Sequence, residues 1–367
     1  MSAPDAMTTV PGSRAEGAQA PMAHRIAIAV DAPATARIIA PMRIFARRLG
    51  VAFLLLWLVL TITFALVRLA PGDAATLLVP PSASAADAAR LRAELGLDAP
   101  LVVQYARWIG GALRGDLGES YVHARPVAAV LADALPLSLG LGLASLALTF
   151  IFGVLVGMVQ ALRRGRPSDL VLTVATTTMY AAPSFWLALA LVAVFTYGAA
   201  RWGFPPALRL PAFGVRDPAA TAGGLAAFMD VVRHAILPVA TLALVGAAGV
   251  ARYARSAVAD VLSALWVRAA AAKGVARRRI YFRHVLANAM PPLIVLLALS
   301  VPGILAGSVF VESVFAWPGM GRVMLSAIAS RDYPVVLGAT ALYAALVIGA
   351  NLIADLVLPL LDPRRRA

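Results

Sequence analysis

Apolar residues gather into six blocks of about 20, and this pattern constrains the fold more than any other feature. The blocks lie at 49–69, 135–162, 170–200, 235–251, 290–311 and 335–361. Each is long enough to cross a hydrocarbon core of about 30 Å as a helix. A transmembrane strand needs only about 10 residues of alternating polarity, whereas 53–65 is almost unbroken apolar sequence. We therefore predict an all-α polytopic membrane protein with six transmembrane helices. We expect the third to start as an interfacial turn and to be kinked at Pro183.

Composition excludes several classes of protein. Of the 367 residues, 61% are hydrophobic and 14% charged, against roughly 45–50% and about 25% in soluble domains. An ordinary soluble enzyme is therefore excluded. The chain has no cysteine, which excludes disulfides, thiolate catalysis and cysteine-ligated metals.

The distribution of charge predicts the orientation. The net charge is +14. The termini together with the loops 163–169 and 252–289 carry 20 Lys and Arg against 7 Asp and Glu if Asp355 of the last block is counted there, whereas the other three loops, with Arg68 at the end of the first block, carry 12 against 11. Positive residues concentrate on the cytoplasmic side of membrane proteins, so we expect both termini to be cytoplasmic. The basic residues then mark topology and attraction to anionic headgroups, and we expect no nucleic-acid partner.

The first 42 residues differ in kind from the rest. They are rich in Ala, Pro, Gly and Thr and contain no sustained apolar run, so we expect a disordered cytoplasmic tail. Because Met42 directly precedes the first block, we hypothesise that translation can start there. Residues 43–366 would then form the membrane domain.

Two loops carry helical signals. In the external loop 71–133, Ser84 and Asp87 form a capping-box pattern before a helix at 85–95 that Gly96 ends, and a second amphipathic helix follows Pro100. We expect a lid on the bundle, with a docking surface as the other interpretation. In the cytoplasmic loop 252–289, apolar residues recur at helical spacing from Val258, and Gly274 supplies the stop. Arginines follow, and we expect Pro291 and Pro292 to open the next span.

Short motifs follow one another at 68–73 (RLAPGD), 115–118 (GDLG), 267–284 (VRAAAAKG to RH), 317–321 (WPGMG) with 331–334 (RDYP), and 362–364 (DPR). In this order they resemble the inner-membrane permease subunit of the dipeptide/oligopeptide/nickel family of binding-protein-dependent ABC importers. The resemblance covers about residues 43–366.

The resemblance implies an ABC importer type I permease fold in the inner membrane. It implies as partners a second homologous permease subunit, one or two ATP-binding subunits that hold ATP and Mg, an extracytoplasmic solute-binding protein and the bilayer. It also implies that the loop 252–289 couples to the ATPase. The coupling residues would be Arg268, Ala269, Ala270, Ala271, Ala272, Lys273, Gly274, Arg278, Arg283 and His284. The acidic residue that names this loop in the family is absent.

A second candidate site lies after the fifth span. We expect Glu312 at its outer end and a tight turn at Pro318 and Gly319, held at the membrane surface by Phe315 and Trp317. As a functional hypothesis, the external mouth of the pathway would be shaped by Glu312, Trp317, Pro318, Gly319 and Gly321. An aromatic interface anchor is the structural alternative.

Catalytic motifs are not found in the sequence. It contains no phosphate-binding loop of the Gly-x-x-x-x-Gly-Lys type, no His-Glu-x-x-His pair and no Gly-x-Ser-x-Gly elbow, so we expect no catalytic residue, metal or cofactor in this chain. The resemblance to the importer family implies an ABC permease for peptides or related small solutes. The alternative is a channel or secondary transporter subunit that is not coupled to ATP. The sequence does not identify the solute.

Overall fold

The structure is a computed structural model that describes residues 34–69, 84–219, 223–305 and 309–361. Within these ranges the regular elements are helices, and no strand is present. The chain divides into two compact units, Met1–Phe53 and Leu54–Ala367, and each is described by itself.

In the first unit the described residues belong to helix α2 (Ala34–Leu69), which continues into the second unit. Residues 34–42 are therefore helical, although we expected a disordered tail up to 42. Ala, Met and Arg are good helix formers, and these residues extend the first spanning helix by continuing its register. Residues 1–33 of the predicted tail lie outside the described residues.

The second unit contains ten further α-helices of eight or more residues within the described ranges. They are α4 (Ala85–Glu94), α5 (Leu101–Ala112), α6 (Val127–Leu162), α7 (Pro167–Ala181), α8 (Ser184–Val192), α10 (Gly224–Leu262), α11 (Leu265–Ala272), α13 (Leu286–Leu305), α15 (Met320–Ala329) and α16 (Tyr333–Leu361), with the short α14 (Val309–Val314) between α13 and α15. Shorter turns are η1 (Ala193–Gly198), α9 (Ala199–Arg201), η2 (Pro206–Leu208), α12 (Arg277–Arg279) and η3 (Ile280–Val285).

Six stretches of helix in the described residues are long and apolar enough to cross a membrane. They are Arg47–Leu69, Val127–Leu162, Ser184–Arg201, Gly224–Leu262, Arg277–Val301 and Tyr333–Ala354. The prediction of an all-α protein with six spans is confirmed.

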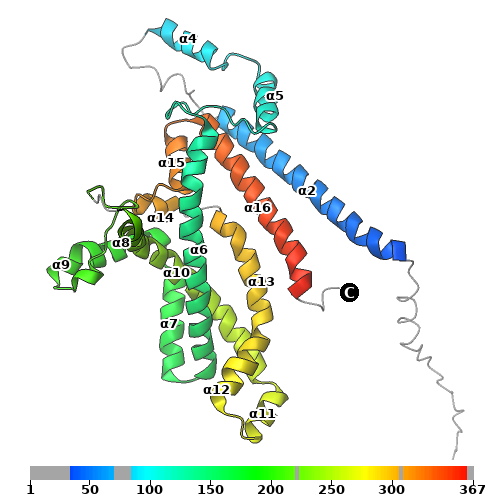
Figure 1. The fold of residues 1–367 in the computed structure, drawn as a ribbon, viewed down its shortest axis with the longest axis vertical. Coiled ribbons are helices and arrows are strands. Elements are labelled where there is room, and N and C mark those ends of the chain that lie inside the picture. The colour runs from blue at the N-terminus through cyan, green and yellow to red at the C-terminus, as the bar shows by residue number, and fades with distance from the viewer. Residues whose placement is uncertain (1–33, 70–83, 220–222, 306–308, 362–367) are drawn as a thin grey trace, which may run out of the picture. The chain divides into compact units, whose positions relative to one another are not determined.

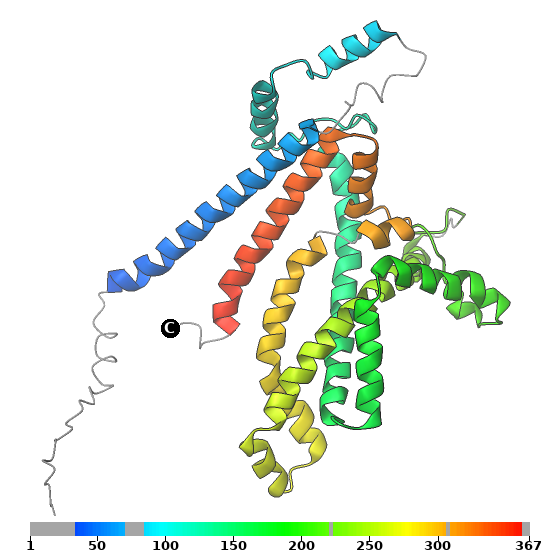
Figure 2. The same cartoon turned by 180° about the vertical axis from the view of Figure 1, so that it is seen from behind.

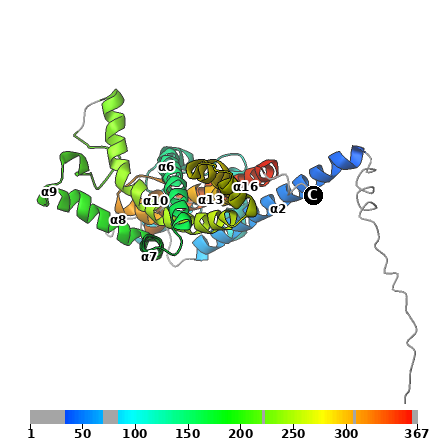
Figure 3. The ribbon, with the colours of Figure 1, turned by 90° about the horizontal axis from the view of Figure 1, so that it is seen from below.

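Helices α6 and α10 form the centre of the second unit (Figure 1; Figure 2). Glycines on α6 allow their backbones to approach closely: a Cβ on Gly153 would lie 2.6 Å from the Cβ of Val250, and one on Gly157 would lie 2.7 Å from that of Ala254. Small residues at a helix crossing are typical of membrane bundles. Helix α13 packs against both α6 and α10, as the end-on view shows (Figure 3).

The third span differs from the prediction. Instead of an interfacial turn and one kinked helix, the chain forms α7 from Pro167 and then α8 from Ser184. Ala182 and Pro183 between them are extended, with ψ of 129° and 133°. The ring of a proline disfavours the helical conformation of the residue before it, which explains a full break at Ala182.

The fourth and fifth spans are both longer at the end that carries α11. Helix α10 runs on to Leu262. The prediction of a single coupling helix from Val258 to Gly274 is therefore wrong. Ser263 and the extended Ala264 divide this segment into the end of α10 and the separate helix α11. The fifth span starts at Arg277 rather than at the prolines. Pro291 and Pro292 lie inside α13, where a membrane helix can tolerate them.

The two helices predicted for the loop 71–133 are confirmed as α4 and α5. Ser84 caps α4: its hydroxyl accepts the Asp87 N–H at 3.2 Å, and its own N–H donates to Asp87 Oδ2 at 3.0 Å. This bonding lowers the pKa of the Asp87 carboxyl. Gly96, with φ of +66°, follows the helix end as expected.

Candidate functional site

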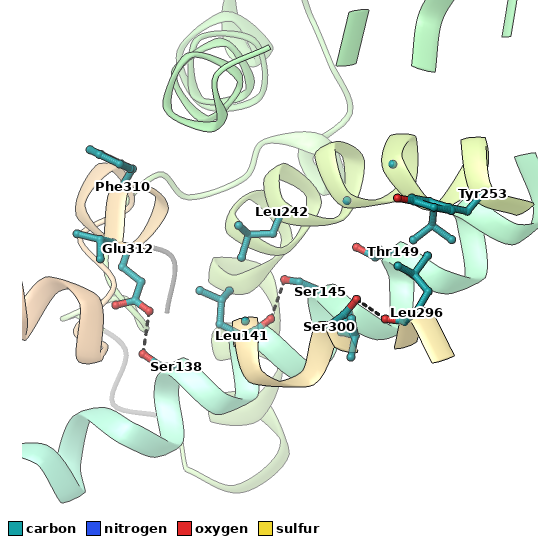
Figure 4. Close-up of a pocket in the computed structure, with 17 residues that line it drawn as sticks. Ser138, Leu141, Ser145, Thr149, Leu242, Tyr253, Leu296, Ser300, Phe310 and Glu312 are labelled. Carbon is teal, nitrogen blue, oxygen red and sulfur yellow. Dashed lines mark hydrogen bonds between the residues drawn. The ribbon is translucent and has the colours of Figure 1, made fainter. Parts of the chain in front are cut away.

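A cavity of about 670 Å³ lies between α6, α10, α13 and α14 (Figure 4). Its lining is mainly apolar, and polar groups reach it from all four helices. These polar residues are Ser138, Ser145, Thr149, Tyr253, Ser300 and Glu312. The volume falls within the roughly 300–1,000 Å³ of small-molecule sites.

The contribution of α6 to the cavity follows from helical spacing. Ser138, Ser145 and Thr149 stand at i, i+7 and i+11, so they lie on one face. The Ser145 hydroxyl donates to the Leu141 carbonyl at 2.7 Å, and Ser300 on α13 does the same to Leu296 at 2.7 Å. Hydroxyls bonded within their own helix leave a mildly polar wall that holds no fixed charge.

Glu312 is the single charged side chain among the residues that line this cavity. It is 1% exposed. Ser138 Oγ donates to Glu312 Oε1 at 2.8 Å, and the Arg322 N–H donates to Oε2 at 3.1 Å; Figure 4 shows the Ser138 and Glu312 side chains pointing toward each other. Because Arg322 lies in the first turn of α15, the carboxylate sits at the positive end of that helix.

Ser138 and Glu312 together cap α15, whose own N-cap residue, Gly319, has no side chain to do so. Ser138 Oγ accepts the Met320 N–H at 2.8 Å. There is no room at Gly319 for a larger residue, since a Cβ there would lie 2.6 Å from Glu312 Oε2. At Gly321 a Cβ would lie 2.8 Å from the Cα of Val309. The glycines of the WPGMG motif thus allow α14 and α15 to pack closely against each other and against α6.

Four of the five residues predicted for the external mouth therefore pack together, while Pro318 is exposed. The predicted position of Glu312 at the end of the fifth span is wrong, and so is the predicted role of Phe315 and Trp317 as anchors at the membrane surface. Glu312 lies in the separate helix α14, beyond the fifth span. Phe315 and Trp317 are 1% and 3% exposed rather than at a membrane surface, and Trp317 Nε1 donates to the Leu137 carbonyl at 3.2 Å. The tight turn directs both rings into the helix core.

At the other candidate site, α11 ends in a Schellman motif. The Gly274 N–H donates to the Ala271 carbonyl at 3.0 Å, and the Val275 N–H donates to that of Ala270 at 3.2 Å. Gly274 has φ of +75°, which glycine adopts without steric cost. The prediction that Gly274 ends the helix is confirmed.

One side of α11 is anchored and the other is exposed. Val267 packs in a cluster with Val258, Ile280 and Val285, which joins α11 to α10 and η3. Most of the predicted coupling residues are exposed, and Ala270 and His284 are half-buried. The exposed ones are Arg268, Ala269, Ala271, Ala272, Lys273, Gly274, Arg278 and Arg283. The structure thus brings the ten residues to one end of the bundle.

An ion pair near this end was not predicted. Arg255 Nη2 on α10 donates to Asp169 Oδ2 on α7 at 2.8 Å, and the carboxylate also accepts the Gly165 N–H at 3.1 Å and the Thr173 hydroxyl at 3.3 Å. Burial by itself would raise the pKa of the Asp169 carboxyl, but these three donors outweigh it and the pKa is lowered. Partners 86 residues apart give no local sequence signal.

Two of the family-like motifs meet at the opposite end. The Asp332 carboxylate, 1% exposed, accepts the Ser120 hydroxyl and the N–H groups of Tyr121 at 3.1 Å and Val122 at 3.2 Å. Burial raises the pKa of the Tyr121 phenol, although Arg68 hydrogen-bonds it and acts against the shift. The RDYP and RLAPGD motifs therefore converge, through Asp332 and Arg68, on one polar cluster with the residues that follow GDLG.

Family models match most of the chain. Residues 153–367 match the binding-protein-dependent transport system inner membrane component, and residues 41–142 match the N-terminal model of such membrane components. The chain belongs to this family. It is a permease subunit of an ABC importer, a transport protein and not an enzyme, and it is a multi-pass protein of the inner membrane.

Curated relatives of the permease are named for peptide transport. It is 36% identical to the oligopeptide transport system permease AppB of Bacillus subtilis over 83% of this chain and 92% of the relative. It is 36% identical to the di/tripeptide permease DppB of Pseudomonas aeruginosa (88% and 98%) and 33% identical to the dipeptide permease DppB of Escherichia coli K12 (87% and 97%). Among solved structures, the MetNI methionine ABC transporter is similar with a TM-score of 0.44 and 16% identity, covering 64% of this chain and 96% of that chain.

The described residues contain no group of three His, Asp or Glu side chains that could hold a metal ion.

Proposed function

We propose that this permease forms half of a translocation path for peptides, and that the cavity beside Glu312 belongs to that path. One observation supports this most: a cavity of about 670 Å³ with a mixed polar and apolar wall lies between the central helices of a chain whose relatives are peptide permeases. Such a wall suits solutes with varied side chains, because it offers hydrogen bonds without shape selection. Glu312 adds one negative charge, which favours the α-ammonium of a peptide over an anionic solute.

We further propose that α11 and the arginines after it couple the path to ATP hydrolysis in partner subunits. The exposed alanines of α11 allow close approach of a partner groove, and Lys273, Arg278 and Arg283 can pair with its acidic groups. The cluster around Val267 supports this role, because it would transmit a displacement of α11 to α10 and the fifth span. ATP and Mg would be held by the partners, with no cofactor in this chain.

The remaining partners are part of the same proposal. A second homologous permease subunit would complete the path, and one or two ATP-binding subunits would dock at the α11 end. A solute-binding protein would deliver the peptide at the opposite end, over the lid formed by α4 and α5. The excess of Lys and Arg at the termini and in the loops 163–169 and 252–289 supports an orientation with both termini and α11 in the cytoplasm.

Uptake of labelled dialanine by the reconstituted transporter tests the path. Gly303 lines the cavity, and a Cβ there meets nothing within 4 Å, so Gly303→Phe should fill the space and abolish uptake while ATP hydrolysis continues. Gly349→Phe is the matched control, since Gly349 is also open within 4 Å but does not line the cavity. Undiminished uptake by Gly303→Phe would exclude the cavity from the path. Uptake without ATP would replace the proposal by a channel.

Docking is tested separately. Ala272→Leu enlarges an exposed position of α11 and should weaken binding of the ATP-binding subunits in a pull-down of the purified complex. The same substitution at Ala128, exposed in the first turn of α6, is the control and should leave binding unchanged. Equal binding by both variants would refute the assignment of α11.

A further inference from the structure

A second, smaller pocket of about 260 Å³ lies where the first span ends, between Arg68 on α2 and the helix α5. Arg107 and Asp116 are exposed at its rim, whereas Gln104 is buried. Trp108 completes the polar part of the lining. The pocket belongs neither to the transport cavity nor to the α11 end.

Unsatisfied polar atoms are concentrated at this pocket. Six buried side-chain nitrogen and oxygen atoms have no hydrogen-bond partner in the described part of the chain, and three of them belong to residues that line it: Arg68 Nε, Gln104 Oε1 and Trp108 Nε1. Buried polar groups are normally paired. Two unpaired donors beside one unpaired acceptor therefore point to a ligand that offers both an acceptor and a donor.

The orientation of the Gln104 amide is fixed by its surroundings. Its Nε2 donates to the Leu97 carbonyl at 3.0 Å and to the Ala99 carbonyl at 2.7 Å. A flipped amide would set its oxygen against two carbonyl oxygens, so Oε1 must be the atom without a partner. Gln104 is 7% exposed. This places a hydrogen-bond acceptor at the floor of the pocket.

The charges suit a zwitterionic group with its anion toward the arginines. Arg68 and Arg107 bring two positive charges and Asp116 one negative charge. A Cβ on Gly96 would lie 3.9 Å from Arg107 Nη1, so this guanidinium lies beside the pocket wall. Arginine is well suited to bind phosphate because its donors are fixed in one plane. An ammonium group can then meet Gln104 Oε1, with Asp116 as a nearby counter-charge.

The place of the pocket favours a lipid as the source of such a group. Arg68 lies in the last turn of the first spanning helix. Phe64, Tyr105 and Trp108 form an aromatic cluster beside it, with ring centroids 5.2 to 6.4 Å apart. Arginine and aromatic rings at the end of a span are typical of the headgroup layer of a bilayer.

We propose that this pocket binds the headgroup of a phospholipid that carries an N–H donor, phosphatidylethanolamine. The phosphate lies against Arg68, Arg107 and the Trp108 indole N–H. The ammonium donates to Gln104 Oε1. Bound in this way, the lipid fastens α5 to the end of the first span at the membrane surface.

Native mass spectrometry of the whole transporter, released from nanodiscs of equal phosphatidylethanolamine and phosphatidylcholine, tests the proposal. Phosphatidylcholine has the same phosphate but no N–H donor, so the wild type should retain phosphatidylethanolamine at least about tenfold more strongly, the effect expected for a lost hydrogen bond to a charged donor. Arg107→Gln should reduce this retention about tenfold, as the loss of one charge-assisted contact does. Arg114→Gln is the matched control, because Arg114 is exposed in the adjoining loop but does not line the pocket.

Each other outcome overturns the proposal. Equal retention of the two lipids by the wild type removes the role of Gln104, and equal effects of Arg107→Gln and Arg114→Gln remove the role of the pocket. Displacement of the lipid by inorganic phosphate or dialanine would assign the pocket to a small soluble ligand. Transport of peptides is a separate measurement, so failure here leaves the proposed function standing.

Discussion

Ser138 on α6 and Glu312 on α14, 174 residues apart in sequence, are joined by a hydrogen bond of 2.8 Å that also fixes the start of α15. Ser138 is 3% exposed. Because its hydroxyl donates to the carboxylate and accepts the Met320 N–H, the Ser138 oxygen connects all three helices. This connection lies in the wall of the cavity between α6, α10, α13 and α14.

Ser138→Ala should therefore destabilise the permease. It leaves a buried N–H and a carboxylate oxygen without this partner, at a cost of about 1–3 kcal/mol, measurable as a lower thermal unfolding midpoint in detergent. Ser145→Ala is the matched control, since Ser145 also lines the cavity but bonds only to its own helix, and it should change the midpoint little. Glu312→Gln should be milder than Ser138→Ala, because the amide oxygen can still accept the Arg322 N–H and the amide nitrogen can donate to Ser138 Oγ. Equal midpoints for both serine variants would show that the connection contributes nothing.

The contact between α6 and α10 makes a second prediction. Gly157→Ala places a Cβ 2.7 Å from that of Ala254 and 2.9 Å from the Arg255 nitrogen, and overpacking of this kind costs about 1–3 kcal/mol. On the same helix, Gly140→Ala meets nothing within 4 Å and should be neutral or stabilising by up to about 1 kcal/mol. Unfolding in detergent measures both. If Gly157→Ala were as stable as Gly140→Ala, close packing at this crossing would not matter.

At the α11 end, Gly274→Ala should impair coupling through the backbone alone. A Cβ at Gly274 touches nothing within 4 Å, but φ of +75° costs an alanine about 1–2 kcal/mol, which favours loosening of the Schellman turn. We expect a several-fold lower rate of ATP-driven uptake, and a smaller loss in Gly274→Asn because asparagine tolerates this conformation.

Gly165 provides the control for that experiment. It has φ of +79° and equally open surroundings, but it lies in the loop between α6 and α7. Gly165→Ala should show a similar loss of stability without the loss of uptake. If both variants transported equally well, the turn at Gly274 would be a structural feature and not part of coupling.

Local patterns predicted well what depends on neighbouring residues. Block length predicted the six spans, the Ser84 and Asp87 spacing predicted the cap of α4, and Gly274 predicted the end of α11. These features depend on helix length, on bonds across three residues and on one backbone angle. Each can be recognised without knowing the tertiary structure.

Features that depend on distant contacts were missed or misplaced. The sequence predicts Trp317 at a membrane interface. An aromatic residue near the end of a span can be either an interface anchor or a buried core residue, and only the turn at Gly319 decides between the two. The cavity was not predictable, since serines bonded to their own helix resemble any others in sequence. The break at Ser263 also has no strong local signal, as neither Gly nor Pro is present there.

Acid should weaken the contact between α7 and α10. The lowered pKa of Asp169 means that its carboxylate stabilises the folded protein fully above the ordinary aspartate pKa of 3.8, and that this contribution is lost as the pH falls through the lower folded value. Asp169→Asn should therefore lower the unfolding midpoint at pH 7 and flatten its fall as the pH drops through 3.8 and below. Asp260→Asn, at an exposed carboxylate on the same end of α10, is the control and should keep the wild-type pH profile. A wild-type profile in Asp169→Asn would mean that Arg255 and Asp169 do not hold the two helices together.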